Sequence, residues 1–273
     1  MKLKILGSAA AEGWPGLFCE CATCAEARRL GGRNIRRRTA YVLDESLLVD
    51  FGPDAYWQSI EFGVDLLKVD DILFTHSHAD HLNSLELSWR RKGYSQVERT
   101  LRVHGNAHVL GRIRRETATP DEKLRLTMQE LHSGATFAVG PWTVTAFAAQ
   151  HASPEEDALN YALQKDGKTI LIGHDTGWWP DASWEQVVPF RFDLAILECT
   201  YGILSPEARS HHLGAAATVA FRDELRRRGC LDDASRVIVN HFSHNGGANY
   251  DALREWFAPR GLEVAYDGLE VEL

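Results

Sequence analysis

The sequence lacks any long apolar run. No stretch approaches the roughly 18 consecutive apolar residues that a membrane-spanning helix needs. The first residues, Met1–Leu6, are also without the extended apolar core of a signal peptide. We therefore expect a cytoplasmic protein that has no membrane partner. Internal repeats and low-complexity segments are absent as well, which excludes solenoids and compositionally biased tracts.

Basic residues are outnumbered by acidic ones. The chain has 30 Lys and Arg against 38 Asp and Glu, which gives a formal net charge of −8. A broad nucleic-acid groove needs a basic face that replaces released counterions, so nucleic acid is not the expected partner. A small-molecule substrate is the expected one, and assembly into a homodimer stays open.

Cysteines are few, and they are unevenly placed. The 273 residues contain 5 cysteines, and three of them are Cys19, Cys21 and Cys24. An odd number in a chain expected to be cytosolic argues against a disulfide framework. Three thiols at Cys-x-Cys-x-x-Cys spacing suit zinc coordination, which requires a fourth ligand. Reduced, buried thiols at the start of a helix are the alternative.

The most informative segment is His76-Ser77-His78-Ala79-Asp80-His81, which directly follows the apolar run 72–75. That run is typical of a short buried strand, so the polar cluster falls where the strand ends. In an extended loop His76 and His78 point the same way, while Asp80 and His81 can turn toward a second centre. The spacing predicts two adjacent metal sites, and a solvated histidine-rich turn is the alternative.

Other apolar runs end in the same manner. Three of them are each followed by one side chain able to bind a metal, namely His151, Asp175 and His241. Taken singly, these are ordinary as a loop histidine, a turn residue and a group at a strand end. Their common position after a strand makes them a set, which we expect to complete the first cluster.

Apolar runs alternate with amphipathic segments along the chain. Strands are expected at residues 3–6, 47–50, 72–74, 101–104, 142–148, 169–172, 194–198 and 237–240. Helical spacing is found at residues 24–30, 81–91, 184–188, 215–228 and 250–257. Turn residues at 139–141 and 165–168 indicate hairpins, so part of the sheet is antiparallel. This pattern predicts an α/β sandwich with mixed sheets in a single domain, residues 1–273.

The motif His-x-His-x-Asp-His, with a later His, a later Asp and a final His, resembles the signature of the metallo-β-lactamase superfamily. The resemblance spans nearly the whole chain. It implies a four-layer αββα sandwich, the metallo-β-lactamase fold, with metals at one edge of its two sheets. It also implies a ligand set: His76, His78 and His151 for the first metal, Asp80, His81 and His241 for the second, and Asp175 bridging both.

A narrower resemblance comes from residues 6–24, which are similar to the phosphodiesterase group of the carbon-phosphorus lyase pathway. In that group a histidine just past the last active-site histidine joins three cysteines around a structural zinc. The match implies that the ligands here are Cys19, Cys21, Cys24 and His244. Such a closed site would hold the amino-terminal loop beside the loop that carries His241.

The expected ligands predict hydrolysis of a small phosphodiester, either linear or cyclic. Two divalent ions, zinc or manganese, activate water and neutralise a phosphoryl oxygen. The resemblance implies that a histidine before a helix protonates the leaving group, and the pair His211-His212 matches it. We favour His212, although the doubled histidine leaves the register open. Asp80 and His212 are thus the expected catalytic residues, while Asp50 and His174 are expected to orient ligands.

Other functions stay open. A hydrolase of the same fold acting on a carboxylic ester, lactone or thioester is the first alternative. The amino-terminal segment also resembles a pyrroloquinoline-quinone biosynthesis protein of this fold, which indicates a non-hydrolytic cofactor-assembly module, but the intact ligand set argues against it. The transfer-RNA-processing branch carries a long inserted arm that the sequence lacks, so RNA processing comes third.

Overall fold

Two sheets form the centre of the computed structural model, which describes residues 1–273. The first sheet contains β1 (Lys2–Gly7), β2 (Ala40–Leu43), β3 (Leu47–Val49), β4 (Asp71–Leu73), β5 (Leu101–Gly105), β6 (Leu126–Glu130) and β14 (Glu270–Glu272), in the spatial order β14-β1-β2-β3-β4-β5-β6. The second contains β7 (Thr136–Val139), β8 (Trp142–Ala148), β9 (Leu159–Lys165), β10 (Lys168–Gly173), β11 (Leu194–Glu198), β12 (Arg236–Asn240) and β13 (Glu263–Val264), in the order β13-β12-β11-β10-β9-β8-β7.

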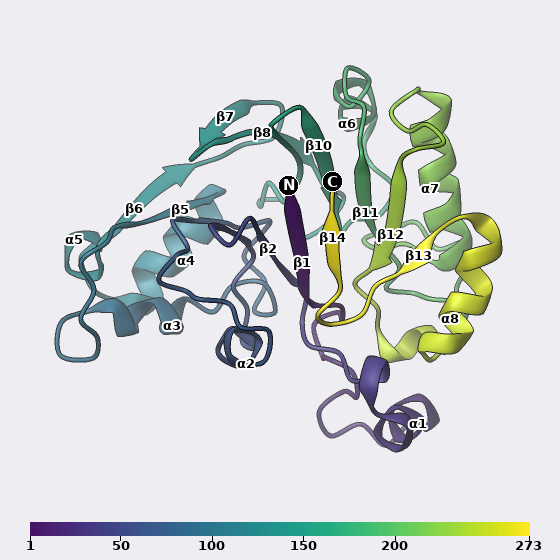
Figure 1. Cartoon of the computed structure of the whole chain (residues 1–273), viewed down its shortest axis with the longest axis horizontal. Coiled ribbons are helices and arrows are strands. Elements are labelled where there is room, and N and C mark those ends of the chain that lie inside the picture. Colours follow the sequence, from purple (N-terminus) through teal and green to yellow (C-terminus); the bar gives the residue numbers. More distant parts are fainter.

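Helices cover the outer faces of both sheets (Figure 1). Those packed on the first sheet are α2 (Ala55–Glu61), α3 (Ser84–Leu87), α4 (Ala107–Thr117) and α5 (Asp121–Leu124). Those packed on the second are α6 (Asp181–Gln186), α7 (Ala215–Arg227) and α8 (Tyr250–Phe257). Helix α1 (Ala22–Leu30) lies instead at one edge of the sandwich, below β1 and β14 in Figure 1. Short 3₁₀ turns are η1 (Gly32–Asn34), η2 (Ser88–Arg90), η3 (His244–Gly246) and η4 (Ala258–Arg260). None of these helices combines the length and apolar character that crossing a bilayer requires.

Successive side chains of a strand point to opposite faces of its sheet, so neighbouring residues belong to different layers of the core. In β10, Ile170 and Ile172 belong to the apolar cluster between the two sheets. The intervening Leu171 belongs instead to the cluster under the helices of the second sheet. All three side chains are fully buried, as expected for a sheet covered on both faces. The four-layer αββα sandwich with mixed sheets is therefore confirmed.

Strand direction brings the carboxyl ends of several strands to one edge of the sandwich. In the second sheet β10, β11 and β12 run parallel, with Glu198 opposite Asn240. Strand β8 runs in the same direction, because β9 is antiparallel to both β8 and β10. In the first sheet β3, β4 and β5 are parallel as well. An isolated bridge between Ala9 and Phe242 joins the two sheets at this edge, and α1 lies below it in Figure 1.

The helix expected at residues 81–91 is shorter than predicted. After His81 the chain first forms an isolated bridge between Leu82 and Phe51, and the amide of Asn83 donates to the Phe51 carbonyl. Helix α3 therefore begins only at Ser84, and it gives way to the 3₁₀ turn η2 after Leu87. Residues 79–81 of the polar motif form a turn before this bridge, and this loop carries the motif into the edge between the sheets.

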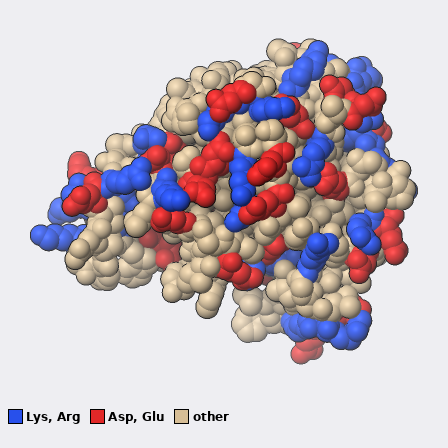
Figure 2. All heavy atoms as spheres, in the orientation of Figure 1, with Lys and Arg blue, Asp and Glu red and all other residues tan.

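Charges of both signs are interspersed over the face drawn in Figure 2. Strand pairing sets Lys4 opposite Glu270 across β1 and β14. The ammonium groups of Lys2 and Lys4 lie 3.1 and 2.9 Å from the carboxylate of Glu270. Exposed pairs of this kind contribute little to stability, because water and salt screen their attraction. This face thus carries paired surface charges rather than a track of one sign.

Candidate metal centre

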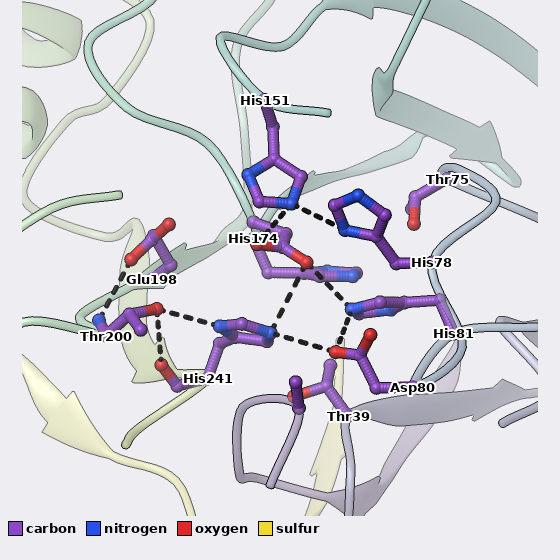
Figure 3. A network of polar contacts seen from close by, with 12 residues as sticks. Thr39, Thr75, His78, Asp80, His81, His151, His174, Glu198, Thr200 and His241 are labelled. Atoms are coloured by element: carbon purple, nitrogen blue, oxygen red, sulfur yellow. Dashed lines mark hydrogen bonds and ion pairs between the residues drawn. The ribbon is translucent and has the colours of Figure 1, made fainter. Parts of the chain in front are cut away.

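The expected ligands converge at the edge where the strands end. The loop after β4 carries one group of them, and the loops after β8, β10 and β12 carry one residue each. The donor atoms form two sets, and within each set they all lie within 4.8 Å of one another. The first set is His76, His78, His151 and Asp175, and the second is Asp80, His81, Asp175 and His241. Asp175 belongs to both sets. Figure 3 shows His78 and His151 on one side of this cluster and Asp80, His81 and His241 on the other.

Two of these residues have a backbone conformation that turns the chain sharply at the strand end. Asp175 has a φ of 55°, and His241 has a φ of 55° as well. Asp and His are among the residues that tolerate this left-handed region, although each such position costs about 1–3 kcal/mol. The fold thus maintains a local strain that directs both side chains into the space between the sheets.

Hydrogen bonds on the outer side of the rings orient four of the histidines. In each case Nδ1 lies next to an oxygen atom: His76 next to Thr75 (3.0 Å), His81 next to Asp50 (2.7 Å), His151 next to the carbonyl of His211 (3.2 Å) and His241 next to Thr200 (2.8 Å). With the proton on Nδ1, the lone pair of Nε2 faces the centre of the cluster. Burial lowers the pKa of His241 to about 4, which favours its neutral form.

The centre of the cluster contains buried polar atoms that make no well-aligned hydrogen bond. These are the Nε2 atoms of His76, His81 and His241 and the Oδ1 atom of Asp175, although they crowd together, with His81 Nε2 only 2.8 Å from Asp175 Oδ2. Leaving such atoms unpaired costs about 1–3 kcal/mol each. Inward-facing imidazole nitrogens and carboxylates are the donors that zinc and manganese accept. The donor set therefore fits a pair of divalent cations.

Asp50 ties the cluster to the first sheet. Its Oδ1 accepts from the amide of Thr75 at 2.9 Å, and its Oδ2 lies 2.7 Å from His81 Nδ1 and 3.0 Å from His174 Nε2. Burial alone would raise the pKa of Asp50, but the adjacent His81 and His174 lower it well below its usual range. The carboxylate stays ionised and fixes His81. Asp50 and His174 thus lie where they were expected, outside the two ligand sets.

Glu198 is a residue of the site that sequence reasoning missed. It ends β11, is fully buried, and its Oε1 lies 2.8 Å from His212 Nδ1. Burial disfavours a charged His212, but the charge and hydrogen bond of Glu198 outweigh it and raise the pKa of His212 to about 9. His212 Nδ1 also lies 3.2 Å from Asp175 Oδ1. A signal existed, because Glu198 is a charged residue closing an otherwise apolar strand.

The two adjacent histidines occupy different environments. The His212 ring lies 4.8 Å, centroid to centroid, from that of His151, so it belongs to the cluster. His211 is exposed and has a φ of 63°. Its contribution to the cluster is its backbone carbonyl, which accepts from His151 Nδ1. The geometry places the side chain of His212, and not that of His211, beside the expected ligands.

The cysteine motif lies beside His244, the histidine expected to complete its zinc site. Donor atoms of Cys19, Cys21, Cys24 and His244 lie within 4.8 Å of one another. His244 Nδ1 is 3.5 Å from Cys21 Sγ, and its Nε2 is 3.4 Å from the carboxylate of Glu12. Burial opposes ionisation of Cys21, but hydrogen bonds, first that from the Cys24 amide, lower its pKa to about 6. A thiolate beside an oriented imidazole fits a zinc site.

A family model described as the beta-lactamase superfamily domain matches residues 46–242, which is more than half of the chain. The chain belongs to this superfamily. The membership expected from the histidine motif is thereby confirmed, and the chain is a hydrolase of the metallo-β-lactamase fold. The fold itself implies bound divalent metal ions.

Solved structures of the superfamily share the fold over the whole chain. A diphosphatase of the PhnP family matches with a TM-score of 0.76 and 21% identity, covering 100% of this chain and 96% of that one. Zinc-bound PqqB from Methylobacterium extorquens matches with a TM-score of 0.76 and 18% identity, covering 100% of both chains. A curated relative, ribonuclease Z from Bradyrhizobium diazoefficiens, is 22% identical over 130 residues, which are 46% of this chain and 42% of the relative.

Proposed function

We propose that this protein is a dinuclear metal-dependent phosphodiesterase that acts on a small phosphodiester. The observation that carries the proposal is the Glu198–His212 pair beside the shared carboxylate of Asp175. A phosphodiester with an alkyl leaving group needs a proton donor at the departing oxygen, whereas many activated esters do not. A buried carboxylate that keeps a histidine protonated next to the expected ligands supplies that donor.

In the proposal, His76, His78 and His151 would hold one divalent cation, Asp80, His81 and His241 would hold the other, and Asp175 would serve both. The two cations supply Lewis acidity, an activated water and neutralisation of phosphoryl charge. The protein keeps the donors in place before any substrate arrives, since the outer hydrogen bonds fix each ring. Zinc and manganese both suit these ligands.

His212 acts as the general acid in this scheme. Its Nδ1–H donates to Glu198 Oε1, so the proton available to the substrate is the one on Nε2. Transfer of that proton to the departing oxygen leaves a neutral imidazole, and solvent restores the proton before the next turnover. Glu198 stays ionised, because burial, which raises its pKa, is outweighed by the charge of His212.

We also propose that Cys19, Cys21, Cys24 and His244 hold a structural zinc. Support comes from the converging donor atoms and from Glu12, whose carboxylate faces His244 Nε2 and leaves Nδ1 toward the thiols. Zinc in this position would join the amino-terminal loop to the loop after β12 and so stabilise the position of His241.

The test is a paired measurement on the purified protein. Metal content is determined by elemental analysis, and rates are measured for alkyl phosphodiesters, carboxylic esters, lactones and thioesters after loading with zinc or manganese. The proposal expects turnover of the phosphodiesters to exceed that of the other classes. Faster hydrolysis of a lactone or thioester would assign the site to the alternative class of the same fold. Metal-loaded protein without any hydrolysis would favour the cofactor-assembly module.

A further inference from the structure

His78 is the expected ligand whose ring is held least by its surroundings. It is exposed, whereas the other histidines of the two ligand sets are buried or half-buried. Each of the others has its Nδ1 atom beside an oxygen atom. The ring of His78 instead faces that of His151, with 3.1 Å between His78 Nδ1 and His151 Nε2 (Figure 3). The backbone therefore has to fix the position of His78.

The backbone of Ser77, the residue between His76 and His78, is held from two sides. The amide of Ser77 donates to Oε1 of Glu156 at 2.7 Å, and its hydroxyl donates to Oε2 of the same carboxylate at 2.7 Å. The carbonyl of Ser77 accepts from the guanidinium of Arg112 in α4. These contacts fix both peptide units of Ser77, which join it to the two histidines.

Glu156 belongs to the loop that carries His151. This loop connects β8 to β9 and bears the third histidine of the first ligand set. Asn106, just before α4, donates from Nδ2 to Glu156 Oε1 at 3.1 Å and to the carbonyl of Asp157 at 2.8 Å. The carboxylate of Glu156 thus joins the loop of His151 to the loop of His78.

The second ligand set is held in place by other residues. Its histidines are oriented by Asp50 and Thr200, which lie outside the contacts of Glu156. The carboxylate of Glu156 accepts only from Ser77 and Asn106. A change at Glu156 should therefore weaken one cation site and spare the other.

We propose that Glu156 is a positioning residue for the first cation site, because it sets the distance between His78 and His151. The inference rests on the proposed function, which requires a cation at each ligand set. Glu156 belongs to neither set, so it acts through the hydrogen bonds to Ser77 and not as a ligand. Removing a residue that orients metal ligands in this way typically costs about 10- to 100-fold in metal affinity.

The test is a titration with cobalt(II) of protein from which exchangeable metal has been removed, because the visible spectrum of cobalt(II) reports its ligands. His78→Ala and Asp80→Ala supply reference spectra for the loss of a ligand from the first and from the second set. We expect Glu156→Ala to weaken one ion about 10- to 100-fold and to leave the affinity of the other unchanged. The spectrum with one bound ion should then match that of His78→Ala and differ from that of Asp80→Ala.

Two further variants separate the hydrogen bonds from the charge. Glu156→Gln keeps an oxygen that accepts from the Ser77 amide, so it should retain most of the affinity that Glu156→Ala loses. The matched control is Glu155→Ala, which removes the same charge from an exposed neighbour in the same loop and should change neither affinity.

Equal losses in Glu155→Ala and Glu156→Ala would assign the effect to charge and overturn the inference. Unchanged affinities in Glu156→Ala, with two exchangeable ions bound to the parent, would also overturn it while the dinuclear proposal stands. A parent that binds a single exchangeable ion, weakened alike by Glu156→Ala and by His78→Ala, would support the role of Glu156 and overturn the dinuclear proposal.

Discussion

Glu198 Oε1 lies 2.8 Å from His212 Nδ1, and the rest of the Glu198 carboxylate is held by the backbone. The amides of Thr176, Thr200 and Leu213 all donate to it at 2.9 to 3.0 Å. One buried carboxylate thus sets the protonation of His212 and fixes three loops around it. A change at this position alters both the chemistry and the local structure.

His212→Ala should slow diesters with alkyl leaving groups by roughly 10² or more, because the departing alkoxide loses its proton donor. Nitrophenyl diesters, whose leaving group needs no proton, should be nearly unaffected. The measurement is the ratio of parent to variant rates for one diester of each kind. His211→Ala is the matched control and should leave both ratios near one; a larger alkyl effect in the control would move the general acid to His211.

Glu198→Gln should shift the alkaline limb of the pH profile of kcat/KM to lower pH. In the proposed mechanism His212 is active in its protonated form, so the rate would be retained below the pKa of His212 and lost as the pH rises through it. Glu198 raises that pKa to about 9. Removing the charge of Glu198 lowers the pKa, so the loss of activity begins at a lower pH. An unchanged limb in a folded variant, as judged by thermal melting, would separate Glu198 from the proton donor.

Asp175→Ala should abolish turnover and reduce the content of exchangeable metal while the chain stays folded. Asp175 is the one residue that belongs to both expected ligand sets, so both cations lose a donor at once. Elemental analysis and activity after loading with excess metal are the measurements. Activity within a few-fold of the parent would show that Asp175 shapes the turn but is not needed to hold the metals.

Cys21→Ser should lower the zinc content by about one atom per chain and reduce the melting temperature. The hydroxyl is a poor substitute for the thiolate among the converging donors. Cys230→Ser is the matched control, because Cys230 is buried in the core away from the cluster. Equal zinc content in the two variants would contradict the structural-zinc proposal.

Gly52→Ala should impair the metal centre through the backbone. A Cβ atom at residue 52 would lie 1.9 Å from the carbonyl oxygen of Asp80, so the loop that carries this expected ligand has to shift. We expect a loss of about 1–3 kcal/mol in stability, accompanied by lower activity. The control is Gly111→Ala in α4, where nothing lies within 4 Å and helix propensity predicts a gain of about 0.5–1 kcal/mol.

The convergence of the expected ligands could be predicted from sequence, because each follows a strand, and parallel strands end at one edge. Every strand expected from an apolar run is present. Strands β2 and β6, however, were not expected, although β2 is buried throughout. Their pairing with neighbours decides their structure, and a short apolar stretch does not show which strand it will pair with.

The remainder of the site depends on contacts between residues far apart in sequence. Glu198 meets the amide of Thr176 and the ring of His212 only after β10, β11 and the loop before α7 have assembled. The length of α3 could not be predicted for the same reason, since the bridge between Leu82 and Phe51 competes with the helix. Local periodicity carries no information about such partners.

The loops that carry His151, Asp175 and His212 meet at Gly177. A Cβ atom at this position would lie 2.2 Å from Gln150 Oε1, 2.4 Å from the carbonyl oxygen of Arg209 and 2.7 Å from the amide nitrogen of His211. Two of these three atoms belong to the main chain, so exchange of the side chains at positions 209 and 211 leaves their contacts in place. The spacing of these loops is therefore independent of the surface side chains that they present.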